Sequence, residues 1–324
     1  MLFVDGRAIM ADVDVTSKIH EAPSPPNEGP PFLNDPGGMF HRYWNRASFR
    51  FSHKLAGHPL FELGSLVELS QRMPKCADFA YWSNGTEGVD NHWGARGKSL
   101  SLQDTIAGIA DNNSLVLIKH AWQDELYGPV LQSCLSEAVE RCGSGMRHDV
   151  ILGNATILIA SPNRVTPYHL DWDCNFLAQI AGNKKLHVFN GADRTLLTQA
   201  ELERFCAGDI NSAKYQPARE KDSAVYDLGP GDGAHVPVAA PHWARNGDNI
   251  SVALSMNFEL RSEARRLDLY RIQHWARRAG LHPPALERAG MAWRTAALAL
   301  AAARGLRNLV RPFDDGLPTR WRPS

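Results

Sequence analysis

The sequence predicts a mainly β protein, a β-sandwich or jelly roll with helices at its flanks. Between residues 149 and 260, short runs rich in β-branched and other apolar residues follow one another, separated by Gly, Pro and Asn turns. Such punctuated runs are typical of sandwiches and jelly rolls and do not fit a parallel α/β sheet. No repeat with a period of 20–50 residues is present, which excludes a solenoid.

Composition places the chain among globular proteins. It has 324 residues, of which 44% are hydrophobic and 22% charged, so it is too apolar for disorder. Lys and Arg together number 35, as do Asp and Glu, which argues against a chain built for nucleic acid or for an anionic membrane surface. The five cysteines form no CxxC pair, so neither a disulfide scaffold nor a zinc knuckle is indicated.

The first residues carry acids where a signal peptide requires basic residues followed by an apolar stretch. The longest apolar run, near residues 296–303, is too short to span a bilayer. We therefore expect a cytoplasmic protein that has neither a membrane nor a nucleic-acid partner.

Two regions precede the predicted β core. Residues 1–38 are expected to be irregular and outside the core, because residues 21–38 contain six prolines and three glycines. Residues 39–148 read as a mixed lead-in of helices and strands. Its predicted helices cover residues 61–72, 102–110 and 127–142, and its predicted strands cover residues 78–82 and 114–119.

The core is predicted over residues 149–260 and a basic helical tail over residues 261–324. The predicted core strands are residues 150–152, 155–160, 185–189, 224–228, 235–237 and 250–258. From residue 260 onward the chain has 13 arginines, no lysine and five acidic residues, within two helix-like stretches at 263–279 and 286–310. We interpret these as helices packed on the β domain or on a second subunit, in a homodimer; the alternative is a basic surface for an anionic partner.

Three residues of the predicted core, His169, Asp171 and His242, are candidate metal ligands. His169 and Asp171 are two residues apart, so on a strand both side chains would point to the same face. Inside a small barrel their buried charge would require compensation, which a metal cation supplies. His242 follows a turn-and-strand pattern and would complete a triad of two imidazoles and one carboxylate. That set suits Fe(II) and leaves coordination positions open.

An isolated His-x-Asp triplet has a second interpretation, a core histidine bonded to the neighbouring carboxylate. The positions of Lys184 and Thr166 favour the metal site over this interpretation. Lys184 begins the next strand-like run after a tight Ala-Gly-Asn turn, which would aim its ammonium back toward the same cavity. With a hydroxyl such as that of Thr166 it would hold the far carboxylate of a dicarboxylate. The alternative for Lys184 is a solvated lysine at a strand end.

Taken in chain order, the segments TPYHLD, AQI-G-KK, VP, PHWARN and SMNF resemble the motifs of jumonji-type (JmjC), cupin-like 2-oxoglutarate oxygenases. The resemblance is closest to the asparaginyl hydroxylase of hypoxia-inducible factor and to bacterial cupin-like relatives. It covers residues 150–260; the lead-in matches loosely, and the tail matches nothing that we can name. It implies a double-stranded β-helix (jelly roll, cupin-like) core with a mixed α/β N-terminal lead-in and a helical C-terminal tail.

The resemblance also assigns residues to roles. The implied Fe(II) ligands, which are also the catalytic residues, are His169, Asp171 and His242. The residues implied to bind the cosubstrate 2-oxoglutarate are Thr166, Lys184, Asn175 and Asn257. In one departure from many relatives, residues 114–119 contain no tyrosine to act as a further partner of the cosubstrate carboxylate.

The activity implied is that of an Fe(II)- and 2-oxoglutarate-dependent dioxygenase, a hydroxylase that uses O2 to couple 2-oxoglutarate decarboxylation to C–H oxidation. Its substrate would be a peptide or protein side chain or a small metabolite. The alternative is a non-catalytic cupin-like or jumonji-like binding or regulatory protein, in which any metal would be structural.

Residues beside these candidates have weaker signals. Asp173 would share the strand face of the ligand pair and either meet the substrate or be solvated. Trp172 and Trp243 would line the substrate cleft or simply pack. His187 is expected to face the other layer, and His242 is preferred to His235 as the distal ligand because the family pattern places that ligand just after the VP turn.

Overall fold

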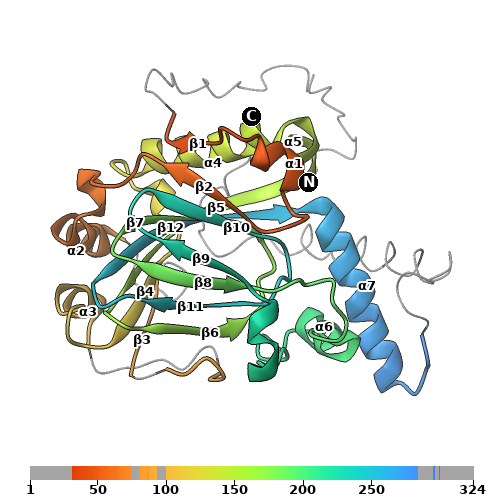
Figure 1. Cartoon of the computed structure of the whole chain (residues 1–324). Coiled ribbons are helices and arrows are strands. Elements are labelled where there is room, and N and C mark those ends of the chain that lie inside the picture. Colours follow the sequence, from red (N-terminus) through yellow and green to blue (C-terminus); the bar gives the residue numbers. More distant parts are fainter. Residues whose placement is uncertain are drawn as a thin grey trace, which may run out of the picture.

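The computed structural model describes residues 31–73, 80–85, 87–92 and 100–283, with single positions at 295 and 299. Its described part consists of two antiparallel sheets with helices around them (Figure 1). Across the larger sheet the strands are β1 (Leu33–Asn34), β2 (Phe49–His53), β10 (Asp232–Val236), β7 (Cys174–Ala181), β12 (Ser251–Leu260), β5 (Val150–Ala160), β4 (Ser114–Ile118) and β3 (Ala80–Asn84). Across the smaller sheet they are β6 (Val165–His169), β11 (His242–Asn246), β8 (Lys184–Val188) and β9 (Ala224–Leu228).

Helices cover the flanks of this β core. They are α1 (Met39–Tyr43), α2 (Leu63–Arg72), α3 (Leu102–Ala107), α4 (Gly128–Cys142), α5 (Ser144–Asp149), α6 (Gln199–Cys206) and α7 (Arg261–Arg278). Three 3-10 turns are η1 (Pro59–Phe61), η2 (Ala121–Gln123) and η3 (Pro217–Asp222). Among the described residues, no helix combines the length and hydropathy needed to cross a bilayer.

The strand order confirms the predicted jelly roll. From β5 to β8 the chain passes from one sheet to the other at every step, and it does so again from β9 to β12. The larger sheet thus holds β10, β7, β12 and β5 side by side, opposite β6, β11, β8 and β9 of the smaller sheet. This arrangement is a double-stranded β-helix, and the lead-in extends its larger sheet at both edges with β1 and β2 and with β4 and β3.

The two faces of the larger sheet bury different side chains, because successive residues of a strand point to opposite faces. On β7, Phe176 faces outward and stacks on Phe40 of α1, with ring centroids 5.0 Å apart. Asn175 and Leu177 face inward and line a cavity between the sheets. The lead-in helices α1 and α4 therefore lie over the outer face (Figure 1), while the inner faces enclose the cavity.

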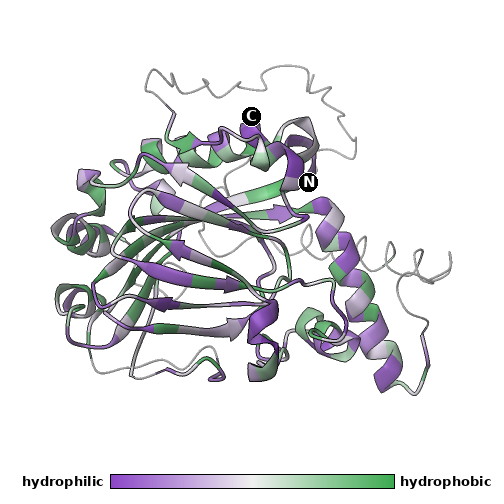
Figure 2. Ribbon diagram, viewed as in Figure 1, coloured by the Kyte–Doolittle hydropathy of each residue, from purple (hydrophilic) through white to green (hydrophobic). Residues whose placement is uncertain are grey.

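Several predicted bounds differ from those observed. The runs at 150–152 and 155–160 form one strand, β5, which continues through Gly153 and Asn154. The irregular segment 1–38 was expected to lie outside the core, but Leu33 is 1% exposed, belongs to β1, and its N–H donates to the carboxylate of Glu137. The first tail helix is observed as α7, which mixes hydrophilic and hydrophobic residues along its length (Figure 2). The second, at 286–310, lies outside the described residues apart from positions 295 and 299.

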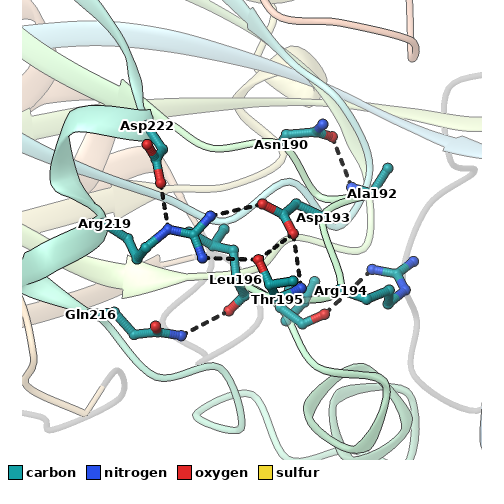
Figure 3. A network of polar contacts seen from close by, with 10 residues as sticks. Asn190, Ala192, Asp193, Arg194, Thr195, Leu196, Gln216, Arg219 and Asp222 are labelled. Atoms are coloured by element: carbon teal, nitrogen blue, oxygen red, sulfur yellow. Dashed lines mark hydrogen bonds and ion pairs between the residues drawn. The ribbon is translucent and has the colours of Figure 1, made fainter.

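A long excursion of 35 residues, 189–223, separates β8 from β9 and is held together by polar contacts (Figure 3). Arg219 of η3 donates to the carboxylate of Asp193 and to the hydroxyl of Thr195, both at 2.9 Å. Gln216 donates to the carbonyl of Leu196 at 3.2 Å. These contacts join the two ends of the excursion and thereby position α6 between them.

The turn from β7 to β8 depends on a glycine. Gly182 has φ +68°, and a Cβ at this position would lie 2.1 Å from the carbonyl oxygen of Ile250. We expect Gly182→Ala to lower the free energy of unfolding by about 3 kcal/mol or more, because backbone strain adds to a clash with backbone. Gly64→Ala in α2, where nothing lies within 4 Å, serves as the control and should leave stability unchanged or raise it by about 1 kcal/mol. Chemical denaturation measures both changes; equal stabilities would contradict the assigned turn.

Candidate metal centre

The three predicted ligands lie together in the wall of the cavity between the sheets. His169 is the last residue of β6, and His242 is the first residue of the neighbouring β11, where the two are register partners. Their imidazole centroids are 4.2 Å apart. Asp171 faces both rings: its Oδ1 is 3.6 Å from Nε2 of His169, and its Oδ2 is 3.4 Å from Nε2 of His242. The ligand atoms of all three lie within 4.8 Å of one another.

Backbone hydrogen bonds fix which imidazole nitrogen is available. Nδ1 of His169 is 2.7 Å from the carbonyl oxygen of Pro167, and Nδ1 of His242 is 2.9 Å from that of Ala240. A carbonyl only accepts hydrogen bonds, so each Nδ1 carries the proton and donates it. When each ring is neutral, its Nε2 carries a lone pair on the side that faces Asp171, which is the arrangement that a metal ligand requires.

The pKa values of His169 and Asp171 favour the protonation states that bind a cation. Burial and the neighbouring charge of His242 lower the pKa of His169 to about 4. Burial alone would raise the pKa of Asp171, but the neighbouring imidazoles of His169 and His242 lower it to about 2, and the carboxylate in turn raises the pKa of His242 despite its burial. At neutral pH the site thus offers an ionised carboxylate and a neutral imidazole at His169, both competent for metal binding.

His169 and Asp171 were expected to share a strand face, and this expectation is wrong. β6 ends at His169, so Asp171 lies instead in the irregular segment before β7. The Asp171 carbonyl accepts a hydrogen bond from the N–H of Ala239, 3.0 Å away. The next residue, Trp172, stacks on Phe205 of α6 with centroids 4.1 Å apart. The carboxylate is thus positioned by tertiary contacts of its own backbone and of its neighbour.

Lys184 lies where the sequence predicts, at the start of β8 in the wall of the same cavity. β7 and β8 belong to different sheets, so the Gly182 turn carries the chain across the cavity. The Lys184 side chain is buried, and no described residue forms a hydrogen bond or ion pair with its ammonium. Burial lowers its pKa to about 8. Thr166 of β6 also lines the cavity.

Asn175 and Asn257 belong to a row of polar side chains on the inner face of the larger sheet, which we call the polar row. The sequence motifs indicated only these two of its members. Asn175 donates to Oδ1 of Asn257 at 2.7 Å and also to the hydroxyl of Ser255. Asn154 and Thr156 of β5 extend the row, since they are register partners of Asn257 and Ser255. Alternating polar residues at 154 and 156, and at 255 and 257, are the sequence signal that would have revealed it.

The remaining candidates divide between the cavity and the protein interior. Trp172 and Asp173 line the cavity; burial, followed by the charges of Asp171 and Glu259, raises the pKa of Asp173 to about 7. Trp243 does not line the cavity: it stacks on His187 on the other side of the sheet, with centroids 4.1 Å apart. The expectation that His187 faces that layer is confirmed.

His235 is a core histidine, which agrees with the choice of His242 over His235 as the distal ligand. Its Nδ1 is 2.8 Å from the carbonyl oxygen of Asn175, to which it donates, and its Nε2 accepts from the N–H of Asn45 at 2.9 Å. Its ring lies between Phe49 and Phe176. Both nitrogens are thus engaged, and neither is available to a metal.

The cavity, of about 600 Å³, has the form expected of a site for a small molecule. Its wall contains the His-Asp-His group, the Lys184 ammonium and the polar row of the larger sheet. The apolar residues lining it include Leu158, Leu177, Leu186, Val236 and Ala244.

The donor set fits a divalent metal ion held on one side only. Two Nε2 atoms and one carboxylate form a facial set with no fourth side chain among the described residues, so open positions remain for other ligands. Structural zinc sites are usually closed by four protein ligands, often cysteines. The described cysteines are buried elsewhere in the core, unpaired, and outside this group.

The fold and the His-Asp-His group define a double-stranded β-helix protein with a candidate metal centre. The sequence and the structure were also compared with those of known proteins. No family model and no curated protein matches the sequence. Among solved structures, Escherichia coli YcfD is similar, with a TM-score of 0.48 and 13% identity over 87% of this chain and 69% of that chain.

Two further structures are similar. YcfD described as a ribosomal oxygenase in complex with cobalt and 2-oxoglutarate has a TM-score of 0.45 and 13% identity over 85% of this chain and 68% of that chain. An oxalate decarboxylase from Lactobacillus farciminis, in a formate complex, has a TM-score of 0.23 and 19% identity over 33% and 24% of the two chains. All three are similar to this chain at low identity; the double-stranded β-helix assignment rests on the strand order described above.

Proposed function

We propose that this protein is an Fe(II)- and 2-oxoglutarate-dependent oxygenase that hydroxylates a peptide or protein side chain or a small metabolite. The observation that carries the proposal is the convergence of His169, Asp171 and His242 in a cavity whose wall also holds the buried ammonium of Lys184. A metal-binding triad and an unpaired cation in one cavity suit a dicarboxylate that binds to both.

The metal, when bound, would supply the oxidative chemistry that couples decarboxylation of 2-oxoglutarate by O2 to oxidation of a substrate C–H bond. The chain supplies position and environment. His169 and His242 present their Nε2 atoms, and Asp171 balances the charge of the cation. Lys184, with the hydroxyl of Thr166, would hold the C5 carboxylate of 2-oxoglutarate.

The apolar wall and the polar row have separate tasks in this proposal. The wall would enclose the carbon chain of the cosubstrate and exclude water, which strengthens the interactions of its two carboxylates with the metal and with Lys184. Asn175 and Asn257, which hydrogen-bond to each other, would orient the cosubstrate from the larger sheet. No general acid or base is required of the chain.

Succinate formation tests the proposal. The purified protein with Fe(II), ascorbate and 2-oxoglutarate is expected to release succinate slowly alone and faster with a substrate found by screening peptides and metabolites. The non-catalytic alternative predicts 2-oxoglutarate or metal binding without any succinate. A protein that binds the metal but forms no succinate above the metal-only background would contradict the proposed activity.

Thr166 provides a specific prediction for cosubstrate binding. We expect Thr166→Val, which removes the hydroxyl but keeps the shape, to raise the KM for 2-oxoglutarate about tenfold, because a hydrogen bond to a charged group contributes roughly 1.5–3 kcal/mol. Thr166→Ser keeps the hydroxyl and should stay near the wild-type KM. Initial rates at varied 2-oxoglutarate measure both; the same KM in all three proteins would show that the hydroxyl does not touch the cosubstrate.

A further inference from the structure

A second cavity, of about 610 Å³, lies against the turn that joins β10 to β11, and we call it the arginine cavity. Its wall is formed by residues 45–48, by residues 188–192 at the end of β8 and beyond, by residues of the turn itself, and by the first residues of α7. It shares no lining residue with the cavity between the sheets. None of the functions assigned above uses it.

Three arginines line this cavity, and two of them have no carboxylate partner. Within the described part of the chain, the guanidinium of Arg194 donates only to uncharged acceptors, namely the carbonyl oxygens of Gly191 and Leu197 and the hydroxyl of Tyr270. The exposed guanidinium of Arg46 forms no hydrogen bond or ion pair with any residue that the structure describes. The wall therefore carries positive charge that has no direct counter-ion.

The acidic residues of the same wall are already paired. Asp222 pairs with Arg219 in the polar network of the excursion between β8 and β9 (Figure 3). Glu263 accepts from Nε of the third arginine, Arg266, at 2.5 Å, and from the side-chain amide of Asn45 at 2.9 Å. Neither carboxylate thus contacts Arg46 or Arg194, whose donors remain for a ligand.

Two guanidinium groups in one cavity suit a phosphate group. A guanidinium binds phosphate oxygens through paired hydrogen bonds, and two of them match a ligand with two negative charges. A phosphate monoester has three acceptor oxygens and a charge of about −1.5 to −2 at pH 7. Part of the remaining wall is apolar, at Val188, Phe189 and Val238, and could cover the organic part of an ester.

The turn between β10 and β11 connects this cavity to the metal centre. The carbonyl oxygen of Ala240, a residue that lines the arginine cavity, accepts from Nδ1 of His242 at 2.9 Å. The N–H of Ala239 donates to the carbonyl oxygen of Asp171 at 3.0 Å. Ala239 has φ +55°, a left-handed conformation that is strained for a residue with a Cβ, so the turn keeps its shape through the contacts around it.

We propose that the arginine cavity binds a dianionic phosphate group, free or on a small ester, and that this ligand stabilises the turn and thereby the metal centre. Arg46 and Arg194 pair with the phosphate oxygens. Asn45, in the cavity wall, accepts from the N–H of Val238 in the turn at 2.9 Å, so a ligand beside Asn45 and Val238 favours the turn as it stands. Phosphate and metal therefore bind cooperatively; this second part rests on the metal centre of the oxygenase proposed above.

Isothermal titration calorimetry of the metal-free full chain tests the phosphate site separately from catalysis. The probes are phenyl phosphate and inorganic phosphate. The control is phenyl sulfate, which keeps the shape of phenyl phosphate but carries a single negative charge. We expect at least one phosphate probe to bind about tenfold or more tightly than phenyl sulfate, and more weakly as salt is added. Tighter binding of phenyl phosphate than of inorganic phosphate identifies an ester as the ligand; equal or weaker binding identifies free phosphate.

Variants then assign the contacts. Arg46→Gln and Arg194→Gln should each weaken the phosphate probe about tenfold, because each removes a hydrogen-bonding partner that carries charge. Arg147→Gln removes an exposed arginine of α5 outside the cavity, and as the matched control it should bind the probe like the wild type. Lys184→Met should also leave probe binding unchanged, because its ammonium lies in the other cavity.

The concentration of free Mn(II), measured by electron paramagnetic resonance, tests the coupling to the metal centre. With the phosphate probe at saturation, the Mn(II) dissociation constant of the wild type should fall about fivefold or more. The Arg46→Gln/Arg194→Gln double variant in the same solution is the reference, since it experiences the same complexes of Mn(II) with the probe. Its Mn(II) affinity should not depend on the probe beyond those complexes.

Equal affinities for the phosphate probes and phenyl sulfate would overturn the site, as would unchanged affinities in the folded Arg46→Gln and Arg194→Gln variants. Loss of probe binding in Lys184→Met would do the same, because it would place the probe in the other cavity. Phosphate binding that leaves the Mn(II) affinity unchanged would overturn the coupling. Phosphate binding by a protein that never forms succinate supports the site and contradicts the oxygenase proposal, and succinate formation without phosphate binding does the reverse.

Discussion

Replacing Asp171 by alanine is expected to abolish metal binding and succinate formation, with a loss of at least about 10³-fold in rate, because altering groups one step further from a metal already costs 10–100-fold. Asp171 is the only carboxylate in the His-Asp-His group, and its oxygens lie 3.6 Å and 3.4 Å from the two Nε2 atoms. Without it, a cation would meet two neutral imidazoles and no negative charge. Metal titration by calorimetry and the succinate assay measure the two losses.

Two controls separate this effect from unfolding. Asp171 has a side chain that is 36% exposed, so its truncation leaves no enclosed void and the variant should stay folded. Asp171→Asn keeps the shape and removes the charge, and it should lose metal affinity as well. Asp227→Ala removes an exposed carboxylate that pairs with Lys185 at the surface, and it should behave as the wild type. Succinate formation that persists in folded Asp171→Ala would refute the assignment of this ligand.

Replacing Lys184 by methionine is expected to have two opposite effects. The variant should lose affinity for 2-oxoglutarate by about 100-fold, since a buried charge-assisted contact is removed, while its metal content is retained. It should also be more stable than the wild type at pH 7, by up to about 3 kcal/mol, because burial lowers the pKa of this lysine from 10.5 to about 8. Methionine fills a similar volume without that cost.

The pH dependence provides a further readout for Lys184. Between pH 8 and 10.5 the unfolded chain keeps the proton that the folded protein releases, so the stability of the wild type should rise with pH relative to that of Lys184→Met. Over the same range cosubstrate affinity should fall, because the ammonium loses its charge. Lys185→Met, at a side chain that is 52% exposed, is the matched control and should shift neither. An unchanged dependence on 2-oxoglutarate in Lys184→Met would show that this ammonium has another role.

Much of the β core follows from local patterns. Short alternating runs predict β5, β8, β9 and β12, because one face of each strand is buried and turn residues end it. The position of Lys184 also follows, since it begins a strand-like run after a turn. The choice of His242 follows from the family pattern, which places the distal ligand just after the VP turn. Those parts of the site that depend on strand order and turns were therefore predictable from the residues and from the family resemblance.

Other features depend on contacts between distant segments. The pairing of β2 with β10 and the burial of Leu33 result from packing against residues far away in the chain, which no local window contains. Strand alternation placed Asp171 on the face of His169, whereas tertiary contacts of Trp172 and Ala239 hold it in an irregular segment. Asp171 does lie beside His169, but for a reason that the local pattern does not contain.

Crystals grown with Mn(II) as a redox-inert substitute for Fe(II), together with 2-oxoglutarate, would test the central claim most directly through anomalous diffraction at the manganese edge. We expect one manganese peak within bonding distance of Nε2 of His169, Nε2 of His242 and the Asp171 carboxylate, with dicarboxylate density extending from it to the ammonium of Lys184. A fully occupied manganese site elsewhere in the molecule, with these three side chains unligated at saturating metal, would contradict it.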